Sequence, residues 1–345
     1  MPLFAGRDAL EASLRESGLQ RYAAMVLGAA RPTIAFTRHV ATDADLAAAT
    51  SKIWGEPDLP PGFEWPERPP LPDLVPDNLD APPAVRYPYF ADLPDILARQ
   101  VAADAAKADA VRRPMPLAFV AQVNLSALAS LPGFDPRLPD HGVLTLFNDP
   151  LDWKARHTRL FWFEDTYALE RRPTPEPSRA LALTVNDTPE HMRDLPIQSE
   201  VWTANSAISA PNHMSWSGGP SYVPSYPADD PLLEWLYEPS GALELESFDP
   251  EFQGGDFGDR LGGWPLVIQG NVEDEVVREH GVPGMVQRYG VTSLAHVMGY
   301  GGESYVMPAG PMRDFDGDGN ISIMMPEDRL AARDFGAVYD IGQRS

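Results

Sequence analysis

The clearest pattern of apolar and polar positions along the chain lies between Met115 and Asn148. An apolar run of strand length, 117–123, leads into a short Leu/Ala segment and then into a loop that contains three prolines. A turn at His141 carries the chain into a second apolar run, 143–147. We expect a strand, a short helical turn and a second strand that share one buried face.

Helical spacing of apolar residues is strongest near the N-terminus. Over 7–30 they recur on one face, which predicts an amphipathic helix that ends before Pro32. Further helices are predicted over 43–51, 91–113, 231–238, 272–289 and around 326–334. Further strands are predicted at 33–40, 159–167, 181–186, 265–272 and 291–300, after the DFDGDG turn, and in GAVYDI near the C-terminus. These elements indicate an α+β fold with a largely antiparallel β-sheet core and peripheral helices.

A segment rich in proline and aromatic residues, 54–90, interrupts this pattern. Proline at this density excludes a long helix or a central strand, whereas linkers rarely carry so many large aromatic side chains. We therefore predict an irregular segment packed on the surface of a single domain, 1–345, with a proline-rich insertion at about 67–113. A proline-rich recognition ligand is the alternative interpretation.

Two apolar runs far apart in the chain resemble each other. LAFVAQVN at 117–124 and SLAHVMGY at 293–300 share an L-A-x-V core, and each precedes a glycine turn into another apolar strand. This sequence similarity favours two β-rich halves of the chain related by an ancient duplication. Chance similarity between short apolar strands explains the echo equally well.

The charge of the chain narrows the classes of partner. Its 345 residues include 50 Asp and Glu against 27 Lys and Arg, a formal net charge of −23. A field of this sign repels phosphate backbones and anionic lipid, so we expect no nucleic acid and no membrane as partner, and it favours a basic protein partner or a small polar ligand. Simple solubility explains the same charge. The chain has no cysteine and no apolar run near its N-terminus, so we expect a cytoplasmic protein without a signal peptide.

Three patches of the sequence carry a family resemblance. They are SKIWGEPDLPPGFEWP at 51–66, the segment PLAFVAQVNLSAL to LPDHGVLTLF at 116–147, and DRLGGWPLVIQGNV at 259–272. Together with the C-terminal sequence they are similar to the YwqG-like family, a bacterial family defined by a domain of unknown function. The resemblance implies an α+β fold with much antiparallel sheet, and it implies no activity. The first patch departs from the family, which usually has Gly-Gly where this chain has Trp54-Gly55.

An acidic turn offers the sharpest local chemistry. Asp314, Asp316 and Asp318 alternate, and Gly319 follows at the sixth position, as at the start of a calcium-binding loop. The twelfth position is Met325, where such a loop has its bidentate glutamate. An Asp/Gly hairpin turn explains the same residues. We expect no cofactor, and calcium is the only metal that the sequence suggests.

Two Gln-x-Asn pairs on strand-like runs suggest a ligand-binding groove. Residues two apart on a strand point to the same face, so each pair can present two amides, with a tryptophan beside them as a flat wall. The alternative is that the amides satisfy backbone groups inside the fold. The candidate binding residues are Trp65, Gln122, Asn124, Trp264, Gln269 and Asn271.

Catalytic signatures are scarce in the sequence. The chain has no Gly-x-Ser-x-Gly elbow and no histidine pair at metal spacing, and its glycine-rich QGGDFGDRLGGWP lacks the lysine of a phosphate loop. Our leading hypothesis is a non-catalytic binding or protein-interaction protein, with an immunity-like role as one form of it. The alternative is a hydrolase that acts on a carbohydrate or similar small substrate through dispersed Asp, Glu and His residues.

Overall fold

Two long strands form the centre of the fold. β2 (Arg31–Thr42) and β11 (Gln198–Ser209) are antiparallel and pair along all twelve residues of each. The threonine, isoleucine, phenylalanine and valine side chains of β2 favour an extended backbone. The computed structural model describes residues 3–71, 81–149, 157–185, 197–210, 230–237, 242, 259–265, 272–281, 294–301 and 319–344.

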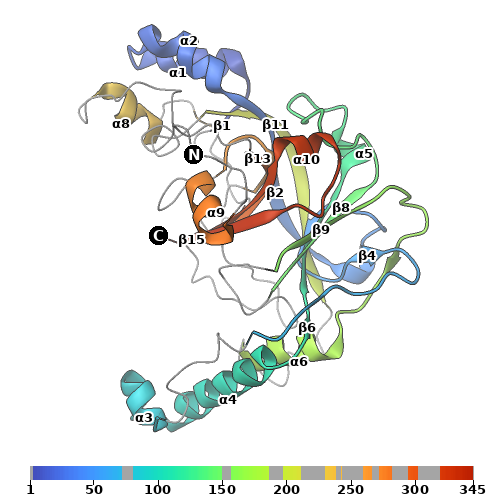
Figure 1. The fold of residues 1–345 in the computed structure, drawn as a ribbon. Helices are drawn as coiled ribbons and strands as arrows, with labels where there is room; N and C mark the ends of the chain where they lie inside the picture. Colours follow the sequence, from blue (N-terminus) through green and yellow to red (C-terminus); the bar gives the residue numbers. More distant parts are fainter. Residues whose placement is uncertain are drawn as a thin grey trace.

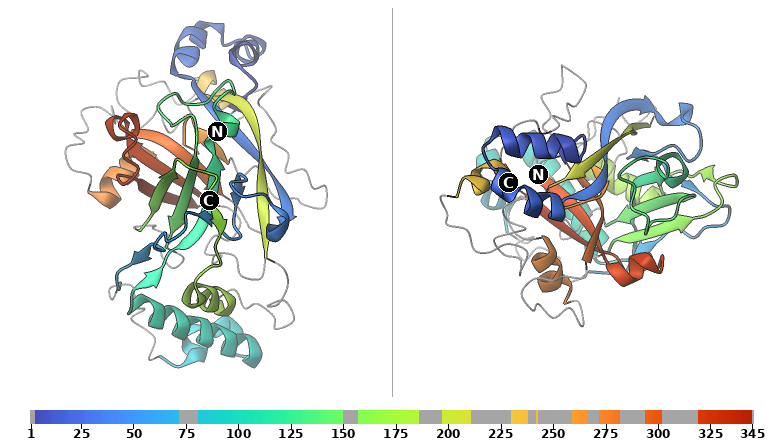
Figure 2. Two further views of the ribbon diagram at one scale, coloured as in Figure 1. Left: turned by 90° about the vertical axis from the view of Figure 1, so that its right-hand side faces the viewer. Right: turned by 90° about the horizontal axis from the view of Figure 1, so that it is seen from above.

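Further strands extend the sheet on both sides of this central pair (Figure 1). On one side β11 is followed by β3, β7, β8 and β9, and on the other β2 is followed by β12, β13, β14 and β15. The curled sheet, seen from two further sides in Figure 2, therefore has two halves with the same order of strands. The bounds are β3 (Lys52–Ile53), β7 (Ala118–Asn124), β8 (Val143–Asn148), β9 (Arg159–Phe163), β12 (Arg260–Gly262), β13 (Leu294–Gly301), β14 (Gly319–Pro326) and β15 (Tyr339–Arg344), with β1 (Leu3–Phe4) beside β11.

The two halves share an irregularity at the same place. The register of β7 against β8 shifts between Phe119 and Ala121, and that of β13 against β14 shifts between His296 and Met298. These positions are equivalent in the L-A-x-V echo of the sequence. A bulge is a specific feature of a strand, so its recurrence together with the strand order supports the predicted duplication.

One hydrophobic core joins the two halves. It contains Leu144 of β8 and Ile323 of β14, both fully buried, although they come from opposite ends of the sheet. Phe36 and Trp202 of the central pair stack with ring centroids 4.6 Å apart in the same core. Removal of these apolar side chains from water supplies the main driving force for closing the sheet on itself.

A second core lies under the N-terminal helices. The helix predicted over 7–30 is interrupted, because Gly18 adopts a φ of +71° and ends the first helix there. Phe4 of β1 and Trp235 stack in this core, with ring centroids 6.0 Å apart. The elements are α1 (Arg7–Glu16), η1 (Gln20–Tyr22), α2 (Ala23–Ala29) and α8 (Pro231–Tyr237).

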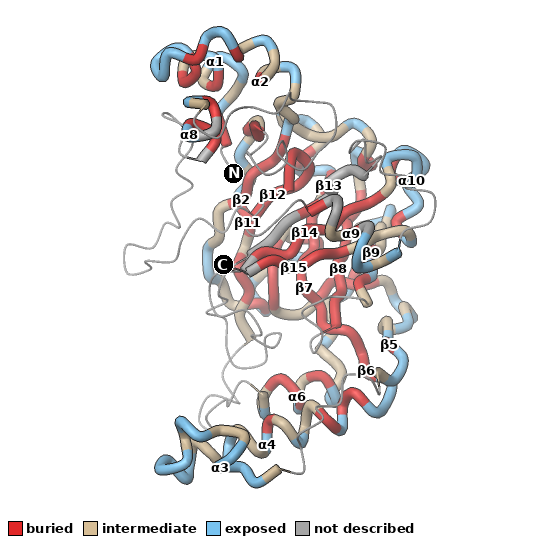
Figure 3. The backbone as a smooth tube through the Cα atoms, turned by 60° about the vertical axis from the view of Figure 1, so that its left-hand side comes forward, coloured by how far each residue is buried: buried red, intermediate tan, exposed pale blue. Residues whose placement is uncertain are grey.

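Residues 81–113 form an arm at one end of the molecule (Figure 1). The arm consists of α3 (Pro83–Arg86), η4 (Pro88–Phe90) and α4 (Pro94–Val111), and α4 packs on α6 (Glu176–Val185). Its end opposite α6 is the most exposed part of the arm in Figure 3. None of the helices in the described part of the chain combines the length and apolar character needed to cross a membrane.

Short elements complete the described structure. β4 pairs with β10 and β5 pairs with β6 outside the large sheet, and α9 packs on β15. These elements tie the chain segments between the long strands to the sheet. Their bounds are β4 (Asp58–Leu59), β5 (Glu67–Arg68), β6 (Met115–Pro116), β10 (Glu170–Arg171), α5 (Leu125–Leu128), α9 (Val272–His280) and α10 (Glu327–Ala331).

Most predicted strands are present, and two elements predicted within the described residues are wrong. The strand expected at 265–272 lies mostly outside those residues. The run at 181–186 was expected as a strand, but its described part is the end of α6, because the preceding Glu, Arg and Ala residues favour a helix that buries its apolar side. The helix expected at 43–51 is only η2 (Asp43–Asp45), since Ala49 adopts a φ of +63° that no helix continues through. The strands expected at 33–40, 117–123, 143–147, 159–167 and 291–300 appear as β2, β7, β8, β9 and β13.

The substitution Gly142→Ala is expected to destabilise the protein more than Gly62→Ala. Both glycines have a positive φ, +81° and +74°, so alanine strains the backbone at each by about 1 kcal/mol. Only at Gly142 would the new Cβ also lie 2.4 Å from the carbonyl oxygen of Phe163, whereas nothing lies within 4 Å at Gly62. This contact adds about 2 kcal/mol. Urea unfolding followed by tryptophan fluorescence measures both, and equal midpoints would contradict the close approach.

Candidate functional site

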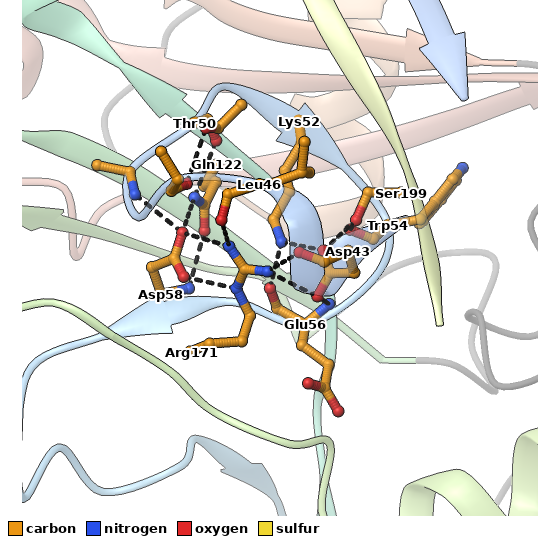
Figure 4. A network of polar contacts seen from close by, with 12 residues as sticks. Asp43, Leu46, Thr50, Lys52, Trp54, Glu56, Asp58, Gln122, Arg171 and Ser199 are labelled. Carbon is orange, nitrogen blue, oxygen red and sulfur yellow. Dashed lines mark hydrogen bonds and ion pairs between the residues drawn. The ribbon is translucent and has the colours of Figure 1, made fainter. Parts of the chain in front are cut away.

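A network of buried charged and polar side chains joins six elements, three strands of the first half of the large sheet together with η2, β4 and β10 (Figure 4). Its members are buried except for the Arg171 side chain, which is 20% exposed. We call it the buried charge network. Its members are Asp43 of η2, Lys52 of β3, Asp58 of β4, Gln122 of β7, Arg171 of β10 and Ser199 of β11.

Lys52 lies inside this network with no exposed surface. Its ammonium group forms an ion pair with Asp43 and donates a hydrogen bond to the carbonyl oxygen of Glu56 at 2.5 Å. The Ser199 hydroxyl donates to the same Asp43 carboxylate. Burial lowers the pKa of Lys52, while the attraction of Asp43 opposes that shift. The lysine is therefore held by its partners against a large desolvation cost.

Asp58 is the second carboxylate of the network and uses both of its oxygens. Arg171 Nε donates to Oδ1 at 2.6 Å, and Gln122 Nε2 donates to Oδ2 at 2.6 Å. The backbone N–H of Ala49 also donates to Oδ2. Gln122 returns a bond, since its Oε1 accepts from the Asp58 backbone N–H at 2.9 Å, and its Nε2 also donates to the Thr50 carbonyl oxygen. Arg171 also pairs with Asp43, so it connects the bonds around Asp58 to the Lys52–Asp43 ion pair.

Glu56 borders the network, but its carboxylate points away from the other members (Figure 4). Partial burial raises the pKa of Glu56, and repulsion from Asp43 acts in the same direction. The positive charges of Lys52 and Arg171 oppose the shift. Burial and the nearby Asp43 carboxylate thus favour the protonated form of Glu56.

Residues 52–57, KIWGEP, which we call the first motif, have a backbone that leaves room for this network. Trp54 and Gly55 both lie in the left-handed region, with φ of +65° and +80°. A Cβ at Gly55 would lie 2.1 Å from Ser199 Oγ and 2.7 Å from Asp43 Oδ1. Glycine is therefore required at position 55. The strain at Trp54 explains why the family that the sequence resembles usually has a second glycine there.

The second half of the sheet repeats the motif. Residues 260–265, RLGGWP, correspond to residues 52–57, KIWGEP, and the strands β12 and β3 that they contain pair with β13 and β7 in equivalent registers. Gly263 has a φ of +75°, and a Cβ there would lie 2.6 Å from Ser209 Oγ, just as Gly55 approaches a serine. Sequence reasoning found both patches but missed that they match each other, although the basic–aliphatic–x–Gly–x–Pro spacing was readable.

Two further arginines, Arg38 and Arg68, form three more ion pairs. Arg38 donates to both oxygens of Asp259, at 2.6 and 2.7 Å, and to Glu200 at 2.9 Å. Arg68 pairs with Asp149 at 2.7 Å, and neither side chain has exposed surface. Opposite charges at such distances in a dry interior hold segments of the chain in one register.

The family of the chain follows from a comparison with family models. The model of a family described as a domain of unknown function, DUF1963, matches residues 51–341. The chain belongs to the DUF1963 family. A comparison with curated proteins finds no match. The DUF1963 match begins one residue before the first motif, ends within β15 and spans both repeated halves of the sheet.

The structure places the candidate binding residues of the DUF1963 domain in separate surroundings. Gln122 is fully buried in the network, and the Asn124 side chain caps α5 by accepting from the Ala127 N–H. Trp65 Nε1 donates to the Leu117 carbonyl oxygen, 2.8 Å away. Trp264 Nε1 donates to the Ala29 carbonyl oxygen, and the Arg31 guanidinium lies 3.6 Å above its ring. Each described candidate thus has a bond within the fold.

The remaining candidates lie outside the described residues. These are the second amide pair and the acidic turn, for which binding stays a prediction. Within the described ranges, no group of three or more His, Asp or Glu side chains is placed to hold a metal ion. The undescribed candidates are Gln269, Asn271, Asp314, Asp316 and Asp318.

The substitution Lys52→Met is expected to lower the free energy of unfolding by about 3 kcal/mol, because it leaves the buried Asp43 carboxylate without its nearest cation. Lys107→Met on the half-exposed face of α4 is the control, for which a change below about 1 kcal/mol is expected. Urea unfolding monitored by circular dichroism measures both variants. A loss for Lys52→Met no larger than the control would show that the network does not stabilise the DUF1963 fold.

The substitution Glu56→Gln is expected to raise the free energy of unfolding above that of wild type, and this gain should be larger at pH 7 than at pH 4. The pKa of Glu56 is raised in the folded state, so the folded protein holds this proton more tightly than the unfolded chain. Wild-type stability from this group is present below the ordinary glutamate pKa and is lost as pH rises through the raised value. Glutamine keeps the neutral form at every pH. Unfolding curves at both pH values test this, with exposed Glu64→Gln controlling for net charge.

Proposed function

We propose that this DUF1963 protein is a non-catalytic binding protein that engages a basic protein partner. The observation that carries the proposal is the distribution of charge. In the described part of the chain, five buried carboxylates are paired with buried or nearly buried cations, which leaves little unbalanced negative charge around them. We take the net charge of −23 to act at the surface, where it attracts cationic surfaces and accelerates their association.

The pairing of the interior carboxylates supports a structural use for them. Five of them contact an arginine or a lysine within the same fold, so their charges are compensated before any ligand arrives. The alternative, a hydrolase acting on a carbohydrate or similar small substrate, needs a carboxylate that is open to substrate and tuned for proton transfer. The paired carboxylates are Asp43, Asp58, Asp149, Glu200 and Asp259.

An immunity-like role is the more specific form of the proposal. In that role the acidic surface would cover the basic active surface of a partner protein and block it. We associate the chain with the YwqG-like proteins on its three sequence patches, and we keep the cytoplasmic location expected from its cysteine-free composition. Binding of a small polar ligand, in place of a protein, is the other form of the same binding hypothesis.

Selection from a random-peptide display library on immobilised full-length protein tests the proposal. We expect the enriched peptides to carry net positive charge. Their binding should fall as salt rises, because the screening length shrinks from ~10 Å at 0.1 M to ~3 Å at 1 M. Charge-reversed versions of the same peptides are the control.

Two results would contradict the binding hypothesis. One is the absence of enrichment over a bare surface, and the other is enrichment with no charge bias. Turnover of a panel of chromogenic glycosides by the same preparation would favour the hydrolase instead. If substitution of the paired carboxylates abolished that turnover, the reaction would be assigned to those residues.

A further inference from the structure

Large apolar side chains gather at the free end of the arm. Val85, Tyr89 and Leu93 are 68%, 92% and 47% exposed, and they are three of the five large hydrophobic side chains exposed in the described part of the chain. The remaining two, Val40 and Tyr167, lie on β2 and after β9. An apolar cluster of this kind on an otherwise acidic protein marks an interaction surface, whereas single exposed residues do not.

The end of the arm is held in one conformation. We call residues 82–95 the arm tip. Proline occupies an early position in α3, η4 and α4, where its fixed φ suits the first turn of a helix. Successive turns are closed by backbone bonds from Val85 to Pro82 and from Leu93 to Phe90. The exposed side chains are therefore presented by a stiff backbone.

Asp104 on α4 anchors the inner side of the arm tip. Its carboxylate pairs with Arg86 and accepts hydrogen bonds from the Tyr87 hydroxyl at 2.7 Å. Burial raises the pKa of Tyr87 to about 12, and the hydrogen bond to Asp104 acts in the same direction. A surface ordered before binding loses less conformational entropy when a partner arrives.

Acidic residues flank the apolar cluster. Asp92 and Asp95 are exposed beside Leu93. The nearby Arg86 is engaged with Asp104, and the exposed Arg99 donates to the backbone carbonyl oxygen of Asp95. The chain as a whole carries a net charge of −23, which disfavours a second copy or an anionic membrane as the occupant. A partner that satisfies both features carries apolar side chains between basic ones.

We propose that the arm tip is the docking surface for a segment of a partner protein in which apolar side chains are flanked by Lys or Arg. The apolar side chains of that segment pack on Tyr89 and Leu93, with Val85 at the border. Its basic residues face Asp92 and Asp95. The assignment rests on the proposed function, because it names the place where the basic partner binds.

Paired variants of the full-length protein test the assignment. Tyr89→Ser with Leu93→Ser removes the cluster, and Val40→Ser with Tyr167→Ser removes the same kinds of exposed side chain elsewhere. The probes are the peptides enriched on the wild-type protein in the library selection. We expect the arm variant to bind them about tenfold or more weakly and the control variant to bind as wild type. Unfolding midpoints of both variants should match wild type, since all four side chains are exposed.

A second variant tests the charge of the site. Asp92→Asn with Asp95→Asn is expected to weaken peptide binding several-fold at low salt and to reduce the salt dependence, because two of the facing charges are gone. Asp8→Asn with Asp165→Asn, two exposed carboxylates outside the arm, is the matched control. Equal salt dependence in wild type and in the Asp92→Asn/Asp95→Asn variant would contradict the proposed orientation of the basic residues.

The outcomes separate this inference from the proposed function. If basic peptides bind and the arm variant binds them as wild type does, the docking surface is wrong and the proposed function stands. If no peptide is enriched, both fail. Concentration-dependent dimerisation of wild type in sedimentation, lost in the arm variant, would overturn the assignment in favour of a second copy. Arm-dependent binding to anionic vesicles would overturn it in favour of a membrane.

Discussion

The ion pair between Lys52 and Asp43 is the interaction on which the first half of the sheet depends. A fully buried ammonium is tolerable only when its partners are complete. Its own partners, Asp43 and the Glu56 carbonyl oxygen, are close in sequence, and Ser199 of β11 reaches the same Asp43 carboxylate from far along the chain. Through Asp43 the pair extends to Arg171, and through Arg171 to Asp58 and Gln122. The network thereby links the end of β2, the first motif, β7, β10 and β11, and it explains why glycine must stand at position 55.

The two repeated halves of the sheet form the scaffold of the fold, and the arm lies outside this scaffold and is free to diverge. Both halves contain a basic–aliphatic–x–Gly–x–Pro motif, a short strand, and a three-stranded meander with a bulge at the same place. The arm is inserted between the first motif and β7, and its exposed end carries apolar side chains that the fold does not need. A surface outside the repeated scaffold can change its partner without disturbing the core, which is where binding function commonly resides.

The sequence predicted those elements whose pattern of apolar and polar residues is visible within a few consecutive positions. The apolar runs that became β7 and β8 are buried throughout, and β2 has the β-branched and aromatic residues of a strand. β11 was missed because polar residues such as Ser199 and Glu200 occupy buried positions where they bond to Asp43 and Arg38. Gln122 was selected from the sequence as a ligand-binding residue, yet its amide bonds lie inside the network. Such partners, 64 residues apart for Gln122 and Asp58, leave no local signal in a single sequence.

The central claim is that the buried charge network is scaffold and that the arm tip does the binding. Amide hydrogen exchange on the full-length protein, with and without a selected basic peptide, tests this most directly. We predict that added protection is confined to peptides covering residues 82–95, while exchange in the first motif and around Gln122 is unchanged. Protection that appears instead at residues 51–60, with no change in the arm, would contradict the account and would make the network the binding site.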